Sequence, residues 1–221
     1  MGIFLYHTPG SCSRVTLNAL EEIGLPFEDR PIDIFKGMQA RPEYLAINPK
    51  AKVPALSIDG RILTETPAIL WYLAQTHSAA ALLPVSGDGM LAIEGLVDLS
   101  WFSNTLHVLA RSARVPGRMT TGDPNLVREH TLQVLAPILR DLDQRVESDR
   151  WWYGDAWSIL DVYLAWIFDM TVGGGVAATD HPSLCAHHQR VRRRPSFERA
   201  LKREEEAMEQ AGIVLPGGGK L

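Results

Sequence analysis

The chain has 221 residues and a formal net charge of -4 at pH 7, with 22 Lys and Arg against 26 Asp and Glu. Nucleic-acid binding depends on a surplus of basic residues that contact phosphates, so this charge argues against a nucleic-acid partner. Hydrophobic residues make up 46% of the sequence and charged residues 22%, which is typical of a folded globular protein. The length allows two modest domains, each with a core of its own.

The apolar segments of the sequence are short. The longest covers residues 159–168, is interrupted by Asp161, and falls well below the roughly 20 residues that a membrane-spanning helix needs. The N-terminal residues lack the basic start, apolar region and cleavage site of a secretory signal. Cys12 and Cys185 are far apart and have the spacing of neither a disulfide framework nor a zinc motif. We therefore expect a cytoplasmic protein with no membrane partner.

Four short strands are expected in the N-terminal part of the chain. They cover residues 3–6, 27–32, 55–58 and 61–64, where apolar residues are bounded by turn-forming residues. An Asp-Gly pair separates the last two strands, and this dipeptide favours a two-residue hairpin turn. The last two strands are therefore expected to form an antiparallel hairpin.

Two helices are expected among these strands. A Pro-Gly pair separates the first strand from a helical pattern that ends at Gly24. Thr66-Pro67 supplies an N-cap and a proline in the first turn of the second helix. The resulting order mixes a parallel crossover with an antiparallel edge, as a thioredoxin-like domain does. We place this α/β domain at residues 1–80.

The rest of the sequence has a helical pattern. Residues 78–89 lack periodicity and are rich in Ala, Pro, Gly and Ser, so we place the domain boundary there. Apolar residues recur at helical spacing over about residues 90–113, and a further helix is expected over residues 123–142. We expect an all-α domain at residues 90–221.

Ser158 and Asp161 have the spacing of a capping box, in which both side chains satisfy backbone donors at the start of a helix. The helix that follows is apolar around nearly its whole circumference as far as Phe168. A helix of this kind is expected to be buried in the middle of its domain.

Cys12 lies where the first strand gives way to the first helix. Free backbone N–H groups and the helix dipole stabilise anions at such a position, so we expect the pKa of this thiol to be lowered. The same field supports a Ser hydroxyl that hydrogen-bonds the thiolate of a bound ligand, so Ser11 and Ser13 remain alternatives to Cys12. The structural alternative is that Cys12 is a small buried hydrophobic residue.

Two further segments have features of ligand binding. Val53-Pro54 stands at the head of a strand, where a cis peptide bond would turn the N–H and C=O of Val53 outward to pair with a peptide, although only about 5% of such bonds are cis. Glu65 and Thr66 place a carboxylate and a hydroxyl at the start of a helix, where they can take an ammonium and a carboxylate. An ordinary N-cap is the alternative for this pair.

Three passages together carry a family resemblance. Residues 48–54 read Asn-Pro-Lys-Ala-Lys-Val-Pro, residues 65–69 read Glu-Thr-Pro-Ala-Ile before Tyr72, and the capping box follows at residues 158–161. In this order, and on the expected fold, they resemble the glutathione S-transferase family along essentially the whole chain.

Within that family, residues 9–13 (Pro-Gly-Ser-Cys-Ser) are most similar to the bacterial Beta class, whose members carry a Cys at the position of Cys12. The passage 101–107 supports this class, because Beta-class proteins carry a His at the position of His107, where it faces the glutathione sulfur. Two positions depart from the Beta pattern: Val108 stands where a Lys is usual and removes a cation, and Thr66 stands where a Ser is usual and keeps the hydroxyl.

The resemblance implies a homodimeric glutathione transferase, active in detoxification, that adds the sulfur of its co-substrate glutathione to a small apolar electrophile. Cys12 and His107 are implied to be the polar groups nearest that sulfur. The other implied contacts are to the glutathione peptide: Val53 with the cysteinyl backbone, Glu65 and Thr66 with the γ-glutamyl end, and Lys36 or Lys52 with the glycyl carboxylate. Ser11 is implied to be a further glutathione-binding residue.

Other activities remain open at this level. A mixed disulfide between Cys12 and glutathione, as in the Beta class, implies thiol transferase or peroxidase activity. Glutathione-dependent isomerisation or ether cleavage uses the same first domain, and Arg111 and Arg114 are candidates to recruit an anionic substrate for it. A binding module that has lost catalysis is the alternative from another functional class.

No metal site is expected. His181, Cys185, His187 and His188 lie close together in the sequence but do not share one helical face at i, i+4 spacing. The nearby arginines at 190–194 indicate a solvated helix end.

Overall fold

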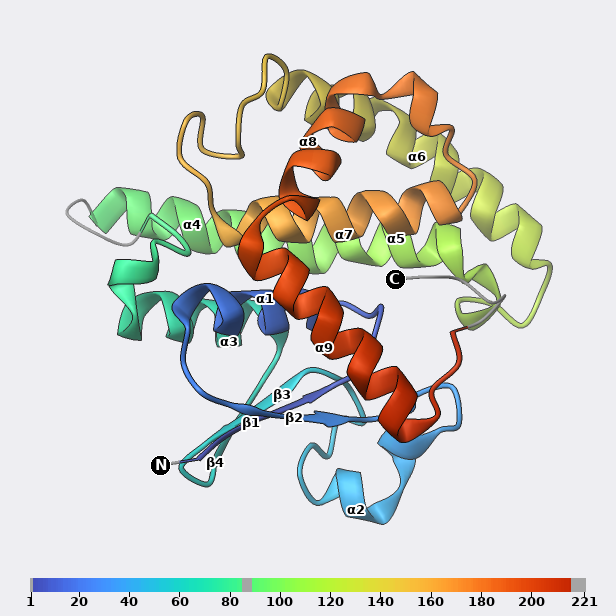
Figure 1. The fold of residues 1–221 in the computed structure, drawn as a ribbon. Coiled ribbons are helices and arrows are strands. Elements are labelled where there is room, and N and C mark those ends of the chain that lie inside the picture. The colour runs from blue at the N-terminus through green and yellow to red at the C-terminus, as the bar shows by residue number, and fades with distance from the viewer. Residues whose placement is uncertain (1, 85–88, 216–221) are drawn as a thin grey trace. The chain divides into compact units, whose positions relative to one another are not determined.

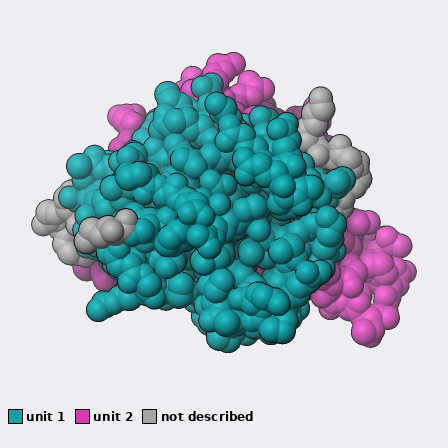
Figure 2. Space-filling view, turned by 60° about the horizontal axis from the view of Figure 1, so that its bottom comes forward, with its two compact units in different colours: residues 1–82, 194–221 teal, residues 83–193 magenta. Residues whose placement is uncertain are grey.

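The computed structural model describes residues 2–84 and 89–215 (Figure 1). The chain divides into two compact units, coloured separately in Figure 2: the first combines Met1–Leu82 with Arg194–Leu221, and the second is Leu83–Arg193. The expected helical domain, 90–221, differs from the second unit, because the C-terminal segment groups with the first. The expected boundary passage, 78–89, includes residues 85–88, which lie outside the described residues.

The first unit is built on a mixed four-stranded sheet. The strands run in the order β2-β1-β3-β4, with β1 and β2 parallel and the other two pairs antiparallel. Helices α1 and α3 pack together on one face of the sheet, and α2 lies on the other side (Figure 1). The thioredoxin-like order predicted from the sequence is confirmed. The elements are β1 (Ile3–His7), α1 (Ser13–Ile23), β2 (Glu28–Pro31), α2 (Pro42–Leu45), β3 (Ala55–Ile58), β4 (Arg61–Thr64), α3 (Thr66–Thr76) and α9 (Pro195–Ala211).

Buried apolar side chains on neighbouring strands stabilise the centre of the sheet, and a hairpin turn with positive φ angles joins its two last strands. Leu5 of β1 faces Leu56 of β3 in the antiparallel register, and both side chains are fully buried. Asp59 and Gly60 join β3 to β4 with φ angles of 50° and 82°. Positive φ at both central residues defines the hairpin turn that Asp-Gly favours, so this prediction is also confirmed.

Helix α9 belongs to the first unit because charged side chains join it to α1. Arg199 donates to a carboxylate oxygen of Glu21 at 2.7 Å, and Arg203 pairs with the other oxygen of the same carboxylate. Arg14 of α1 forms a buried ion pair with Glu204 of α9. These partners are far apart in the sequence, which is why local patterns assigned α9 to the helical domain.

Among the described residues of the second unit the regular elements are helices, as predicted, and two isolated β-bridges lie within residues 151–156. Its elements are α4 (Gly89–Trp101), η3 (Phe102–Leu106), α5 (His107–Arg114), α6 (Pro124–Arg145), α7 (Ile159–Gly173) and α8 (Pro182–Arg192). The first three form a continuous helical stretch, which matches the helix expected over about residues 90–113. The sequence did not indicate that η3 is a π-helical turn in the middle of that stretch.

Helix α7 is buried around nearly its whole circumference, and its capping box is present as predicted. The backbone N–H of Ser158 donates to Asp161 at 2.8 Å. The other carboxylate oxygen of Asp161 accepts from the backbone N–H of Trp152 at 2.7 Å and lies 2.8 Å from Nε2 of His187. Over residues 2–84 and 89–215, α7 included, no helix combines the length and the apolarity that crossing a membrane requires.

Candidate functional site

Cys12 occupies the predicted position at the start of α1, where it is the N-cap residue. Its side chain is partly exposed, and its Sγ lies 3.7 Å from the backbone carbonyl oxygen of Val53. Two predicted site residues from separate segments are therefore neighbours. The arrangement places a thiol beside the peptide group that the sequence singled out for binding an extended ligand.

The two serines that flank Cys12 stabilise the turn before α1. The hydroxyl of Ser11 donates to the carbonyl oxygen of Thr8 at 2.7 Å and lies 2.8 Å from the hydroxyl of Ser13. Ser13 is fully buried, and its Oγ lies 3.4 Å from the backbone nitrogen of Thr8. Burial counts against Ser13 as a contact for a bound thiol, whereas Ser11 and Cys12 are both partly exposed.

The Val53-Pro54 peptide bond is cis. The segment before it is fixed by two donors to one acceptor: the Tyr44 hydroxyl and the Asn48 side-chain amide donate to the carbonyl oxygen of Lys52 at 2.6 and 2.7 Å. Burial raises the pKa of Tyr44 to about 12, so this hydroxyl keeps its proton at neutral pH. Sequence reasoning did not assign a role to either donor, although Asn48 opens the family passage that ends at Pro54.

Glu65 has an unusual backbone conformation at the start of α3. It is the N-cap residue, with φ of 70° and ψ of 118°, a region that residues other than glycine rarely adopt. Conformations of this kind are concentrated at ligand-binding sites, where the surrounding structure maintains them. The predicted N-cap, Thr66, is instead the first residue of the helix and is buried. The correction moves the cap one residue earlier, onto the carboxylate predicted to bind an ammonium.

A lysine that sequence reasoning did not select lies beside this carboxylate. Nζ of Lys50 is 2.7 Å from a carboxylate oxygen of Glu65 and 3.2 Å from the hydroxyl of Thr64. The side chains of Lys50 and Glu65 are each 56% exposed, so a ligand ammonium can replace Lys50 at little cost. Glu65 is thus oriented by a cation but stays accessible.

The two lysines predicted to bind the glycyl carboxylate differ in their contacts. Nζ of Lys36 donates to the carbonyl oxygen of Gly212 at 3.1 Å and lies 3.2 Å from a carboxylate oxygen of Asp33. Lys52 is exposed, and within residues 2–84 and 89–215 no ion pair involves its side chain. Of the two lysines, Lys52 therefore has the fewer contacts within the described residues and the side chain more available to a ligand carboxylate.

His107, in the second unit, is the first residue of α5 and directly follows the π-helical turn η3. Its Nδ1 lies 2.9 Å from the hydroxyl of Tyr163, and its ring packs edge-on against Trp166 with 4.6 Å between the ring centroids. Burial, and then the nearby positive charge of Arg111, lower the pKa of His107 to about 4. The imidazole is therefore neutral near pH 7.

The histidine-rich segment near α8 makes other contacts. Nε2 of His187 lies 2.8 Å from Asp161, Nε2 of His188 lies 2.8 Å from Asp169, and the Cys185 thiol donates to a backbone carbonyl at 3.2 Å. In the described part of the chain, no three His, Cys, Asp or Glu side chains gather in a way that could hold a metal ion.

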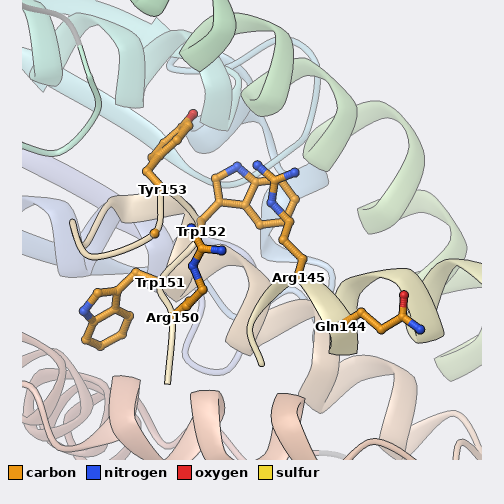
Figure 3. Close-up of a pocket in the computed structure, with 7 residues that line it drawn as sticks. Gln144, Arg145, Arg150, Trp151, Trp152 and Tyr153 are labelled. Atoms are coloured by element: carbon orange, nitrogen blue, oxygen red, sulfur yellow. The ribbon is translucent and has the colours of Figure 1, made fainter. Parts of the chain in front are cut away.

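A polar pocket of about 400 Å³ lies in the second unit, where α6 ends and the next loop begins (Figure 3). The Arg145 guanidinium lies over the Trp152 ring, 3.8 Å from its centroid. The predicted site residues do not line this pocket, so we assign it no part in the predicted chemistry. Its lining residues are Gln144, Arg145, Arg150, Trp151, Trp152, Tyr153 and Gly154.

Comparisons with known proteins support the family resemblance and the fold. The family model described as "Glutathione S-transferase, N-terminal domain" matches residues 10–76. The glutathione S-transferase GstA of Escherichia coli O157:H7 is 28% identical over 206 residues, which cover 90% of this chain and 98% of that protein. A maleylacetoacetate isomerase of Pseudomonas aeruginosa is 29% identical over 74% of this chain and 78% of that protein. The solved structure of a Beta-class glutathione S-transferase from Sphingomonas chungbukensis is 30% identical, covers 91% of this chain and 98% of its own, and has a TM-score of 0.77.

Proposed function

Because this chain belongs to the glutathione S-transferase family, we propose that it binds reduced glutathione as an extended peptide and transfers its sulfur to a small apolar electrophile. One observation carries the proposal: the Cys12 thiol lies at the N-cap of α1, 3.7 Å from the carbonyl oxygen of Val53. A peptide that pairs with the backbone of Val53 brings its own sulfur close to Cys12 and to the start of α1, where negative charge is stabilised.

The remaining glutathione contacts are assigned by charge. Glu65 takes the γ-glutamyl ammonium in place of Lys50, and the hydroxyl and backbone N–H of Thr66 take the γ-glutamyl carboxylate at the start of α3. The glycyl carboxylate is left for Lys52 or Lys36, and the weaker engagement of Lys52 favours it.

The proposed reaction begins when the glutathione thiol loses its proton to solvent or to a buffer base. The resulting thiolate accepts hydrogen bonds from Cys12 and from the neutral ring of His107. Ser11 is the alternative to Cys12, and to donate to the thiolate its hydroxyl turns away from the carbonyl oxygen of Thr8. The thiolate then attacks the electrophilic carbon. In a substitution the leaving group departs with the bonding electron pair, and in an addition the neighbouring atom takes up a proton.

Glutathione-dependent isomerisation is a second candidate, because one relative is named a maleylacetoacetate isomerase. In such a reaction the thiolate adds to a conjugated double bond, the bond between the two carbons rotates, and the thiolate leaves again, so glutathione is regenerated. Arg111, which lies near His107, is a candidate contact for an anionic substrate.

The proposed assembly is a homodimer that acts in the cytoplasm in detoxification. Support for association comes from an apolar stripe on α4, where Met90, Ile93 and Val97 are 66%, 51% and 60% exposed and recur at helical spacing. Neighbouring exposed apolar side chains of this kind are a feature of protein interfaces. Light scattering after size exclusion is expected to give twice the mass of the chain, and Ile93→Glu with Val97→Glu is expected to give the monomer.

The binding part of the proposal is tested by heating the protein with and without reduced glutathione. A hundredfold excess over the dissociation constant is expected to add about 2.7 kcal/mol to the free energy of unfolding. A melting temperature that does not respond to saturating glutathione rejects the proposed function. Turnover of aromatic halides, epoxides, hydroperoxides and a cis-dienoic diacid then separates conjugation, peroxide reduction and isomerisation. Binding without any turnover indicates a non-catalytic module.

A further inference from the structure

The ring of His107 is fixed from two sides within the second unit. Helices α5 and α7 pack side by side (Figure 1), and Tyr163 of α7 is fully buried against α5. Its hydroxyl lies 2.9 Å from Nδ1 of His107. Trp166, less than one turn further along α7, packs edge-on against the same imidazole. The ring therefore has a defined plane and a defined neighbour at one of its two nitrogens.

Tyr163 is itself held in place by the π-helical turn that precedes His107. The ring of Phe102, the first residue of η3, lies 5.6 Å from the Tyr163 ring between centroids, and both side chains are fully buried. A π-helical turn shifts the residues after it around the helix axis relative to a regular α-helix, and such turns are frequent at functional sites. Here the turn contributes Phe102 to the packing of Tyr163 and sets the direction of His107.

The hydrogen bond between Tyr163 and His107 can be made in two ways. A neutral imidazole carries a proton on one nitrogen and accepts at the other, and the partner of one nitrogen sets the role of the other. A phenol O–H is a good donor, and an unprotonated ring nitrogen is a better acceptor than a phenol oxygen. The arrangement with Tyr163 as donor and Nδ1 as acceptor is the more stable one, and it leaves the proton of His107 on Nε2.

We propose that Tyr163 is a positioning residue that fixes the tautomer of His107, so that the ring presents Nε2–H as a hydrogen-bond donor to the glutathione thiolate. This inference rests on the proposed role of His107 in the transferase reaction. The low pKa of His107 agrees with it, because a ring that stays neutral near pH 7 needs a defined tautomer in order to donate. Tyr163 touches neither glutathione nor the electrophile in this proposal and acts only through His107.

The direct test is the nitrogen-15 NMR spectrum of the imidazoles at pH 7, assigned with His107→Asn. We expect the wild-type ring of His107 to be protonated at Nε2 and bare at Nδ1. We expect Tyr163→Phe, which keeps the aromatic ring, to give a mixture of the two tautomers. Tyr153→Phe is the matched control, because the Tyr153 hydroxyl donates to Asp98 at 2.9 Å and not to His107. A wild-type ring protonated at Nδ1, or an unchanged tautomer in Tyr163→Phe, overturns the proposal.

The kinetics of conjugation provide a second, independent test of the proposed role of Tyr163. We expect Tyr163→Phe to lower kcat for conjugation about 2- to 10-fold, the effect of one lost hydrogen bond, with the dissociation constant of glutathione unchanged. The same substitution in a His107→Ala background is expected to have no further effect on kcat. An equal loss in both backgrounds contradicts action through His107. If His107→Ala alone keeps full activity, the proposed catalytic role of His107 fails, and the NMR spectrum still decides whether Tyr163 sets the tautomer.

Discussion

Glu204 of α9 accepts a hydrogen bond from Nε of Arg14 in α1 at 2.8 Å, the same carboxylate oxygen lies 2.7 Å from Nη2 in an ion pair, and both side chains are buried. Its other carboxylate oxygen accepts from the backbone N–H of Gly10 at 3.0 Å. Gly10 lies in the turn that leads to Cys12. The C-terminal helix therefore helps to hold the turn that carries the proposed thiol.

Removing the carboxylate of Glu204 is expected to destabilise the protein strongly. Glu204→Ala removes one partner of a buried ion pair, which typically costs about 3 to 5 kcal/mol, so we expect about that loss in the free energy of unfolding in urea. Glu205→Ala is the control, because Glu205 is the exposed neighbour on the same helix. Arg14→Met combined with Glu204→Leu is expected to restore part of the loss, since neither charge is then buried. A loss below about 1 kcal/mol in Glu204→Ala contradicts this account.

Glu65→Ala is expected to weaken glutathione binding, because it removes the proposed partner of the γ-glutamyl ammonium. A charge-assisted hydrogen bond is worth about 1.5 to 3 kcal/mol, which corresponds to roughly 10- to 150-fold in the dissociation constant measured by calorimetry. The exposed Glu43 of α2 provides the control substitution, Glu43→Ala. Equal affinities for Glu65→Ala and the parent mean that Glu65 serves only as a helix cap.

The parts of the fold that local chemistry determines could be predicted from the sequence. The hairpin of residues 55–58 and 61–64 has the predicted bounds because positive φ at Asp59 and Gly60 is a local property of that dipeptide. The capping box of α7 is local in the same way. The position of α9 could not be predicted, because it depends on Arg14 and Glu204, which are 190 residues apart.

In the candidate site, too, features that depend on local sequence could be predicted, and contacts that depend on tertiary packing could not. The sequence placed Cys12 at the start of α1 from a local turn-and-helix pattern, and it marked Val53-Pro54 as a candidate cis bond, which the structure has. It did not indicate Lys50 as the neighbour of Glu65 or Tyr163 as the neighbour of His107. The contact between Lys50 and Glu65 depends on how the loop that carries Lys50 packs against the end of β4. The contact between Tyr163 and His107 depends on a π-helical turn that has no sequence signature.

The low pKa of His107 has a consequence for stability against pH. The pKa of this group is about 4 in the folded protein and near 6.5 in an unfolded chain, so between these values the unfolded chain binds more protons. The free energy of unfolding therefore falls as the pH falls from 6.5 to 4, by about 3 kcal/mol from this group. His107→Asn is expected to remove that part of the slope in urea unfolding from pH 7 to 4. The control His130→Asn, at an exposed histidine, is expected to keep it, and equal slopes in both variants would contradict the shift.

Cys12 is expected to form a mixed disulfide with glutathione when the protein is treated with oxidised glutathione at pH 7. The Cys12 thiolate attacks one sulfur of the disulfide, a new S–S bond forms, and the second glutathione leaves as a thiolate. Cys185 is the internal control: burial and then the charge of Asp143 raise the pKa of its thiol, so we expect it to stay free. Peptide mass spectrometry locates the adduct, which Cys12→Ala is expected to abolish.

Conjugation of an aromatic halide is expected to survive in part in Cys12→Ala, because Ser11 and His107 remain to hydrogen-bond the thiolate of bound glutathione. A Cys12 that is inert to both oxidised glutathione and alkylation assigns the activation of the thiolate to Ser11 instead.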